Sequence, residues 1–379
     1  MGGEGIPFNR ACLAGREREY LAEAMAGGML GGDGAFTRRC HELLERELGA
    51  SRVLLTTSCT HALEMAALLL EVKPGDEVLL PAFTFVSTVN AFVLRGARPV
   101  FVDIRRDTLN LDQAQIEARL GPNSRAIVPV HYAGVACEMD AILALAAARG
   151  VAVVEDNAHG LFGRYHGRYL GTFGALAAQS FHTTKNFTCG EGGALVINRP
   201  DLVERAEIVR EKGTNRSRFF RGQVDRYTWV DVGSSYLPSE MLAAFLLAQL
   251  EAREEIQTKR RRIWEYYAAH LGDWAERLDC RLPVVPKGCE PAFHLFHLIL
   301  PSEKLRDGLM AHLKERGIAS TFHYLPLHLS EYGRRLGGRP GDLPVTEDLA
   351  GRLLRLPFYN DLSASDLERV VSAVREFAP

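Results

Sequence analysis

Short apolar segments alternate with helical patterns through the first half of the chain, and this alternation limits the folds open to it. Seven segments rich in Val, Ile, Leu and Ala are typical of buried strands: residues 53–55, 77–80, 100–102, 126–130, 151–155, 175–181 and 194–197. Helical patterns fill residues 60–70, 84–94, 111–120 and 139–149 between the first five of them. Strands that alternate with helices of this length predict an α/β fold with a parallel sheet covered on both faces.

The rest of the chain predicts a second, smaller unit. Helical patterns at residues 15–26, 36–48 and 200–212 belong to the first part, and residues 213–227 form a polar, arginine-rich loop. A helical stretch over residues 239–271 leads to a strand at 293–300 and helices at 303–316 and 364–377. A chain of 379 residues exceeds what one hydrophobic core usually holds. We therefore predict a large domain at residues 1–250 and a small α+β domain at residues 251–379.

The bulk composition excludes several classes of protein. With 45 basic and 47 acidic residues, the chain shows no charge excess that would indicate a nucleic-acid partner. It contains no run of about 18 uncharged apolar residues, and residues 1–6 lack the apolar core of a signal peptide. The seven cysteines form no CxxC pair, which predicts free thiols in a reducing compartment. We expect a cytoplasmic, soluble protein with no membrane partner and no metal site.

A lysine beside a glycine-rich turn is the first candidate for catalysis. Lys185 lies between the predicted strand at 175–181 and the glycines of residues 190–193. Loss of solvent there would lower the pKa of its ammonium group and free an amine for a Schiff base with an aldehyde such as pyridoxal phosphate. Alone, a solvated surface lysine is the commoner case. Asp156 alters this balance, because it ends a buried strand upstream and suits the task of keeping a pyridine nitrogen protonated.

Four further groups at strand ends have both a structural and a functional interpretation. Residues 57–60 open a helix, where they could bind phosphate through backbone N–H groups or only cap the helix. An aromatic residue in the segment 81–88 could stack on a flat ring, although a core position fits Phe83 equally well. His159 could hydrogen-bond a ring hydroxyl or the carboxylate of Asp156, or it could only cap its turn. Ser180 could contact a phosphate or simply end its strand.

In this order the segments resemble the DegT-type sugar-nucleotide aminotransferases, which are fold-type I enzymes that use pyridoxal phosphate. The resemblance extends from residue 6 to the last helix and rests on four stretches. These are Thr-Ser-Cys-Thr-His-Ala-Leu at 57–63, Pro-Ala-Phe-Thr-Phe-Val-Ser at 81–87, Val-Glu-Asp-Asn-Ala-His-Gly at 154–160 and Ser-Phe-His-Thr-Thr-Lys at 180–185. It implies a large domain with a mostly parallel seven-stranded sheet and a smaller C-terminal α+β domain.

The resemblance also implies roles for individual residues. Lys185 would carry the cofactor and Asp156 would pair with its pyridinium nitrogen. The other cofactor-binding residues would be Cys59, Thr60, Phe85, His159, Ser180 and Ser235, with Thr60 and Ser180 at the phosphate and Phe85 on the ring.

Two positions depart from the wider family. His159 stands where many members have glutamine, and Gly-Ser-Ser-Tyr-Leu at 233–237 replaces the usual Gly-x-Asn-Tyr-Arg. In the family that asparagine reaches the phosphate in the neighbouring subunit of a homodimer with shared active sites. Ser235, or Ser234 in its place, would make this contact here.

For substrates, the resemblance implies L-glutamate as amino donor and a dTDP-keto-sugar as acceptor. The expected reaction aminates the C4 ketone of dTDP-4-keto-6-deoxy-D-glucose and gives dTDP-4-amino-4,6-dideoxy-D-galactose. Guanidinium groups suit a diphosphate, so the candidate substrate contacts are His131, Arg216, Arg221, His323 and Tyr324. The arginines are as readily surface charges, and residues 323–328 could instead pack the small domain.

Other functions stay open. The acceptor could be another keto-sugar nucleotide, aminated at C3 or C4. A pyridoxal phosphate-dependent sugar dehydratase is an alternative, although such relatives replace the lysine with histidine. The Asp156–Lys185 pair disfavours a purely regulatory role. Residues 31–34 lack the GxGxxG spacing, which disfavours an NAD-dependent dehydrogenase.

Overall fold

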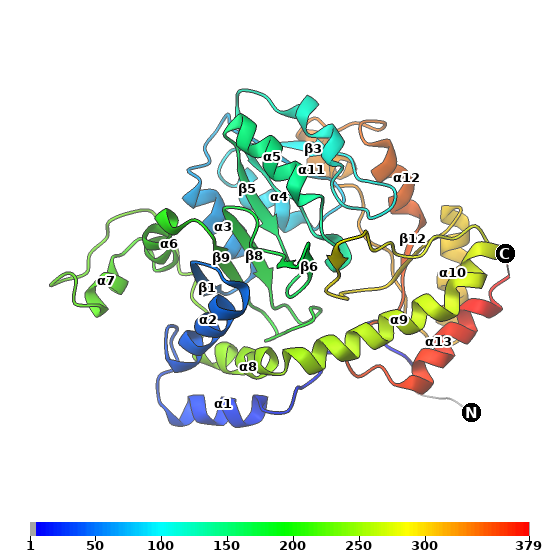
Figure 1. Ribbon diagram of the computed structural model, residues 1–379, viewed down its shortest axis with the longest axis horizontal. Coiled ribbons are helices and arrows are strands. Elements are labelled where there is room, and N and C mark those ends of the chain that lie inside the picture. Colours follow the sequence, from blue (N-terminus) through cyan, green and yellow to red (C-terminus); the bar gives the residue numbers. More distant parts are fainter. Residues whose placement is uncertain (1–4, 379) are drawn as a thin grey trace.

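A computed structural model of the chain describes residues 5–378, and Figure 1 shows its course from the central sheet to the C-terminal helices. Residues 1–4 and 379 lie outside the described residues. Most of the segment 1–6, which is expected to lack a signal peptide, therefore falls outside them. So do the first residues of the expected large domain and the last residue of the expected small domain.

The centre of the molecule is a seven-stranded sheet in the order β1-β9-β8-β5-β4-β2-β3. Its strands are β1 (Arg52–Thr56), β2 (Glu77–Pro81), β3 (Arg98–Val102), β4 (Ser124–Ile127), β5 (Ala152–Asp156), β8 (Leu176–Ser180) and β9 (Gly193–Ile197). Neighbouring strands from β3 through β2, β4 and β5 to β8 run parallel, whereas β9 is antiparallel to both β8 and β1. The α/β class and the mostly parallel seven-stranded sheet expected from the sequence are confirmed.

Helices cover both faces of this sheet because successive strand residues point to opposite sides. Leu54 and Leu195 pack with α3 (Cys59–Leu69), α4 (Val86–Val93) and α6 (Val203–Arg210). Their neighbours Leu55 and Val196 pack on the other face with α2 (Ala35–Leu48) and α8 (Glu240–Glu251). On that same face α5 (Met139–Arg149) covers β2, β4 and β5.

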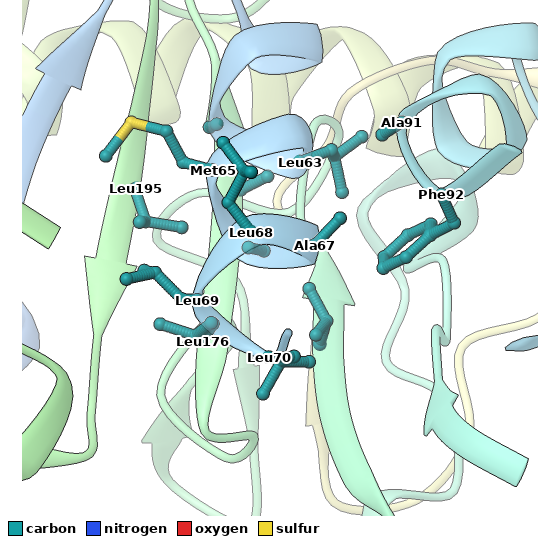
Figure 2. Close-up of a cluster of buried hydrophobic side chains, with 14 of the residues drawn as sticks. Leu63, Met65, Ala67, Leu68, Leu69, Leu70, Ala91, Phe92, Leu176 and Leu195 are labelled. Atoms are coloured by element: carbon teal, nitrogen blue, oxygen red, sulfur yellow. The ribbon is translucent and has the colours of Figure 1, made fainter. Parts of the chain in front are cut away.

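Helix α3 is apolar on almost all sides, and its packing determines the position of its N-terminus relative to the sheet. Figure 2 shows Leu69 of this helix beside Leu176 and Leu195 of the sheet, with Phe92 of α4 on the opposite side of the helix. A fully buried leucine contributes about 1.5–3 kcal/mol. This core therefore holds the N-terminus of α3 at the edge of the sheet where the parallel strands end.

A second core lies in the C-terminal part of the chain. Side chains of α9 (Arg253–Arg277), α10 (Glu303–Glu315) and α13 (Ala364–Glu376) pack around the antiparallel pair β11 (His297–Ile299) and β12 (Leu353–Arg355). In Figure 1, α9 runs from beneath the sheet to these helices. We propose the domain division between residues 250 and 251 because this core is distinct from those of the sheet. Ile6 and Cys12 join it from the N-terminal arm.

Several smaller elements connect these layers. They are α1 (Glu17–Ala26), α7 (Arg216–Phe220), α11 (Glu331–Arg335), α12 (Pro344–Arg352), the short strands β6 (Arg164–Tyr165), β7 (Arg168–Tyr169) and β10 (Cys289–Glu290), and 3-10 turns at Gln113–Gln115, Glu117–Arg119, Tyr132–Gly134, Pro200–Leu202 and Leu327–Leu329. Within residues 5–378, no helix combines the length and the apolar character needed to cross a membrane.

Three sequence predictions were wrong in detail. Residues 111–120 form two 3-10 turns instead of a helix, because Leu111 pairs with Ile104 and Asp112 caps the first turn through the N–H of Ala114. The single helix expected at 239–271 is two helices, α8 and α9, separated at Ala252, where ψ is 13°. The expected loop at 213–227 contains the short helix α7.

Glu155 fixes the end of β5 through contacts on the face of the sheet opposite to Asp156. Its side chain has no exposed surface. Its carboxylate accepts hydrogen bonds from the N–H groups of Gly171, Phe173 and Gly174, each at 2.7 Å. Because adjacent strand residues point to opposite sides, these bonds also fix the direction of Asp156.

We expect Glu155→Ala to lower the free energy of unfolding by about 3 kcal/mol or more, because the buried donors lose their acceptor. Urea denaturation followed by circular dichroism measures the change. Glu117→Ala is the matched control, because the Glu117 carboxylate is 67% exposed and forms only a 3.6 Å ion pair; its effect should stay within about 0.5 kcal/mol. Equal losses in the two variants would contradict this role for Glu155.

Candidate active site

A cavity of about 570 Å³ lies where β1, β2, β5 and β8 end. This edge is where ligands bind in open α/β sheets. Segments remote in sequence complete the wall, among them Phe8 of the N-terminal arm and Arg355 of β12. Nine of the predicted site residues line the cavity: Cys59, Thr60, Phe85, Asp156, His159, Ser180, Lys185, His323 and Tyr324.

Lys185 places its amine in this cavity with little solvent around it. The residue follows β8 in a turn in which its N–H donates to the carbonyl of His182 at 2.9 Å. Burial lowers the pKa of Lys185 to about 8, and the positive charge of Arg355 acts in the same direction, whereas the negative charge of Asp156 opposes the shift. A substantial fraction of the side chain is therefore a free amine just above neutral pH, as an amine nucleophile requires.

Asp156 is buried at the end of β5, and its carboxylate is oriented by two donors. One oxygen accepts a 2.7 Å hydrogen bond from the hydroxyl of Thr88, and the other accepts the N–H of Ala158 at 3.1 Å. Thr88 is itself 2.8 Å from the hydroxyl of Thr84. Thr88 and the N–H of Ala158 hold the carboxylate in one position through uncharged donors, which leaves it able to stabilise a cation in the cavity.

The start of α3 supplies a cluster of donors on one side of the cavity. Ser58 caps the helix by accepting the N–H of His61 at 3.1 Å, so the sequence reading of a cap is confirmed for this residue. The N–H groups of the first helical turn, at Cys59 and Thr60, have no partners within the helix. The hydroxyl of Thr60 donates to Ser87 at 2.7 Å.

The backbone of β9 comes very close to this helix start. A Cβ atom at Gly193 would collide with the backbone of Ser58 and Cys59, so only glycine fits there. Ser180, at the end of β8, pairs with Gly193 and opens on the same side of the cavity. Burial raises the pKa of the Cys59 thiol, which is consequently neutral.

Three histidines and a tyrosine form an aromatic wall on the small-domain side. The His159 ring stacks on that of His294, with centroids 4.1 Å apart, and His323 stacks on Tyr324 at 3.5 Å. Burial lowers the pKa of His159, His294 and His323 well below the ordinary value, and the charge of Lys185 adds to the effect. The wall is therefore neutral, and Nδ1 of His159 is buried without a hydrogen-bond partner.

The two phenylalanines after β2 have different positions. Phe83 is buried and packs edge-on to Tyr324, as a core residue. Phe85 lies at the start of α4 with 57% of its surface exposed and borders the cavity. Phe85 is thus the aromatic residue of this segment that is free to meet a ligand.

His131 does not reach the cavity, contrary to its proposed place in the substrate site. Its side chain has no exposed surface. The N–H of Cys137 donates to Nδ1 at 3.1 Å, so Nε2 carries the proton and donates to Glu155 at 2.9 Å. Both ring nitrogens are occupied, and the residue supports the anchor of β5.

Three other candidates also lie outside the cavity of their own chain. Arg216 is paired with Glu211 at 3.1 Å and Arg221 with Glu207 at 2.7 Å. Ser235 forms a backbone bridge with Glu211. All three belong to residues 213–235, the segment around α7. In Figure 1 the part of this segment that carries α7 extends away from the body of the molecule.

Sequence reasoning missed several residues that the fold brings to the cavity. Ser87 and Thr88 belong to the segment 81–88, where only the aromatic residues stand out in the sequence. Their hydroxyl groups lie in the first turn of α4, six and seven residues after β2 ends at Pro81. His294 and Arg355 come from the small domain, and nothing in their sequence context indicates that they meet Asp156 and Lys185.

The residues present fit pyridoxal phosphate. Its aldehyde requires an amine, its ring nitrogen a carboxylate, and its phosphate a set of uncharged donors. Lys185, Asp156 and the start of α3 with Ser180 provide these groups in one cavity. The glycine-only approach at Gly193 and the unpartnered Nδ1 of His159 are consistent with a bound polar group.

The unusual pKa of Lys185 gives a direct test. In cofactor-free protein, competitive labelling with acetic anhydride, read by mass spectrometry, should reach half its maximal rate at Lys185 near pH 8. Asp156→Asn should move this midpoint below pH 8, because the carboxylate stabilises the ammonium form. Lys259 is the internal control, since the hydrogen bond with Glu255 raises its pKa above the ordinary lysine value. A Lys185 midpoint close to that of Lys259 would contradict the burial of the amine.

Comparison with known proteins agrees with this geometry. The sequence profile of the DegT/DnrJ/EryC1/StrS aminotransferase family matches residues 11–375. The aminotransferase TlmJ from Streptoalloteichus hindustanus shares 33% identity, with a TM-score of 0.89 and 98% of each chain covered. DesV from S. venezuelae, solved in complex with a ketimine intermediate, shares 30% identity, with a TM-score of 0.88 and 100% of each chain covered.

A third neighbour shows the same fold at lower identity. The putative sugar aminotransferase Spr1654 from Streptococcus pneumoniae, in its PMP form, shares 24% identity, with a TM-score of 0.91 and 98% of each chain covered. It has also been solved in a PLP form. The profile match covers nearly the whole chain, and the chain belongs to the DegT/DnrJ/EryC1/StrS aminotransferase family.

Proposed function

We propose that this aminotransferase uses pyridoxal phosphate to move the amino group of L-glutamate to the C4 ketone of dTDP-4-keto-6-deoxy-D-glucose. The product is dTDP-4-amino-4,6-dideoxy-D-galactose. The observation that carries the proposal is one cavity that holds both a lysine with a pKa of about 8 and the oriented carboxylate of Asp156. When bound, the cofactor supplies a ring that accepts electrons from a carbon next to nitrogen.

The chain's own residues divide the remaining tasks. The free amine of Lys185 takes the proton from Cα of glutamate and later returns a proton to C4 of the sugar. Asp156 holds a proton on the ring nitrogen, since its fixed negative charge favours a cation beside it. The start of α3 and Ser180 hold the phosphate without a charged side chain.

The neutral aromatic wall orients what it contacts without adding charge. His159, three residues after Asp156, would offer its unpartnered ring nitrogen to the ring hydroxyl of the bound cofactor. Because the histidines of the wall stay neutral, they do not compete with the cofactor ring for the Asp156 carboxylate. Phe85 covers the cavity from the solvent side and limits access of water.

The choice of acceptor rests on a closer likeness within the family. Six stretches, at residues 32–37, 83–88, 130–140, 211–217, 221–225 and 227–238, resemble dTDP-4-amino-4,6-dideoxygalactose transaminase of the enterobacterial common antigen pathway. This likeness includes the Ser-Ser-Tyr-Leu-Pro version of the motif at 234–238. It supports a role in surface polysaccharide biosynthesis and favours C4 amination over C3 amination.

The main alternative is dehydration of the sugar on the same cofactor. Lys185 argues against it, because a lysine can return the proton to carbon, whereas the dehydratases of this fold have histidine at that position. The identified family is one of aminotransferases. A cytoplasmic location accords with the seven free cysteines and is part of the same proposal.

A homodimer with shared active sites would complete the cavity. The segment around α7 projects from the body and exposes Phe220, Tyr227 and Trp229, the last with 78% of its surface. An apolar surface of this kind is typical of an interface. Arg216, Arg221 and Ser235, which do not reach the cavity of their own chain, would then contact phosphate or diphosphate in the partner's cavity.

The function is tested by analysis of the product. Incubated with L-glutamate and dTDP-4-keto-6-deoxy-D-glucose, the enzyme should yield a nucleotide sugar with an axial amine at C4, identified by NMR. Lys185→Ala should lose several orders of magnitude in rate and the visible absorbance of bound cofactor, whereas Lys259→Ala should behave as wild type. An amine at C3, or loss of water without amination, would overturn the proposal.

The dimer has a separate test. Sedimentation velocity should show a dimer of the wild-type chain and a shift toward monomer for Trp229→Asp, because a charge would enter the apolar interface. Tyr332→Asp is the control, since Tyr332 is also an exposed aromatic residue, at 52%, but lies on α11. A monomeric wild-type protein, or a dimer untouched by Trp229→Asp, would argue against this interface.

A further inference from the structure

Arg355 is a cation in the cavity that has no anionic partner. It ends β12, where its backbone pairs with His297 and Thr321, and its half-buried side chain lines the cavity. Among residues 5–378 no carboxylate lies within ion-pair distance of its guanidinium. The four charged side chains on the cavity wall, apart from histidines, are Arg355, Lys185, Asp156 and Glu191. Neither acid is available to Arg355, since Asp156 is bound by Thr88 and Glu191 lies by His182 at 3.5 Å.

The guanidinium of Arg355 is only weakly satisfied by the protein. It lies over the Phe8 ring at 4.7 Å, and its Nη2 donates a long hydrogen bond of 3.4 Å to the carbonyl of Phe322. Its Nε is buried without any partner. A buried donor without an acceptor and a charge without a counter-ion are both costly. A bound ligand anion would supply both the missing acceptor for Nε and the missing counter-ion for the guanidinium of Arg355. Binding of such an anion therefore explains why this side chain lies at the cavity wall.

The position of Arg355 identifies the anion. Arg355 lines the same cavity of about 570 Å³ as Lys185 and His159, and its positive charge lowers the pKa of both side chains. An amino acid brings a carboxylate within a few ångströms of its own amine. In a 4-keto-sugar nucleotide, by contrast, the diphosphate is attached at C1, across the pyranose ring from the reacting C4.

We propose that Arg355 binds a carboxylate of the amino donor, which is L-glutamate in the proposed function. The inference rests on the proposed function, because it assigns the donor subsite of the same cavity. The planar guanidinium suits a carboxylate through two parallel N–H donors. The ring of Phe8 lies against the guanidinium and excludes water from one side of this pair, which strengthens it.

Binding of glutarate, a dicarboxylate that lacks an amine and cannot react, tests the proposal without turnover. Titration calorimetry on the cofactor-loaded enzyme should show roughly 10- to 100-fold weaker binding for Arg355→Met, the range for a lost hydrogen bond to a charged group. Arg355→Lys should lie between the two. Arg10→Met is the matched control, because the guanidinium of Arg10 lies over the Tyr359 ring at 5.3 Å and does not line the cavity; its binding should equal wild type.

The KM values of the two substrates show whether Arg355 binds the carboxylate of the donor or the diphosphate of the sugar nucleotide. For Arg355→Met the KM for glutamate should rise about as much as glutarate binding weakens, while the KM for the keto-sugar nucleotide changes less than about threefold. A rise confined to the nucleotide sugar would overturn the proposal and assign Arg355 to the diphosphate. A lower Tm with unchanged glutarate binding and KM values would also overturn it and leave Arg355 as an anchor for Phe8. So would a wild-type enzyme that does not bind glutarate.

Failure of the proposed function gives a different result. If wild-type enzyme takes the amine from glutamate but does not aminate dTDP-4-keto-6-deoxy-D-glucose, the acceptor is wrong. The glutarate measurements then still decide the role of Arg355, because they involve no acceptor sugar.

Discussion

The parallel pairing of β5 with β8 is the constraint on which the site depends. Asp156 pairs with Ala178, so β8 runs two residues beyond β5 before the chain turns through Ser180 towards Lys185. The carboxylate and the amine therefore come to one cavity although they are remote in sequence. Glu155, the neighbour of Asp156, holds this arrangement from the other side of the sheet with three backbone donors and His131.

Burial determines which side chains of the cavity carry a charge and how strongly those charges act. It lowers the pKa of Lys185 and of three histidines, which leaves the histidines neutral. Among the described residues, Asp156 and Arg355 are the permanently charged groups that shift the pKa of the reacting amine. In a poorly solvated space a fixed charge acts over a longer distance than in water. One carboxylate and one guanidinium thus divide the cavity into a place for a cation and a place for an anion. That division matches a pyridinium ring and the carboxylate of a donor amino acid.

Much of this could be predicted from the sequence. The seven strands, the positions of Lys185 and Asp156 beside the cavity, and the cap formed by Ser58 follow from local pattern and from the rule that parallel strands end at one edge. Local pattern failed where a tertiary contact decides the structure. The bridge between Leu111 and Ile104 prevents the helix expected at 111–120. His131 is polar and follows a strand, which favours a site residue, but the buried carboxylate of Glu155 engages it. Arg355 and Thr88 reach the cavity only through the packing of the small domain and of α4, which no spacing reveals.

The most direct measurement is to find where the protein binds its cofactor covalently. The protein is incubated with pyridoxal phosphate, reduced with borohydride and digested, and the modified peptide is sequenced by mass spectrometry. The account predicts a pyridoxyl group on Lys185, no modification of comparable yield at any other lysine, and loss of the adduct when excess L-glutamate is added before reduction. An adduct at another lysine, or a Lys185 that stays unmodified in protein saturated with the cofactor, would contradict it.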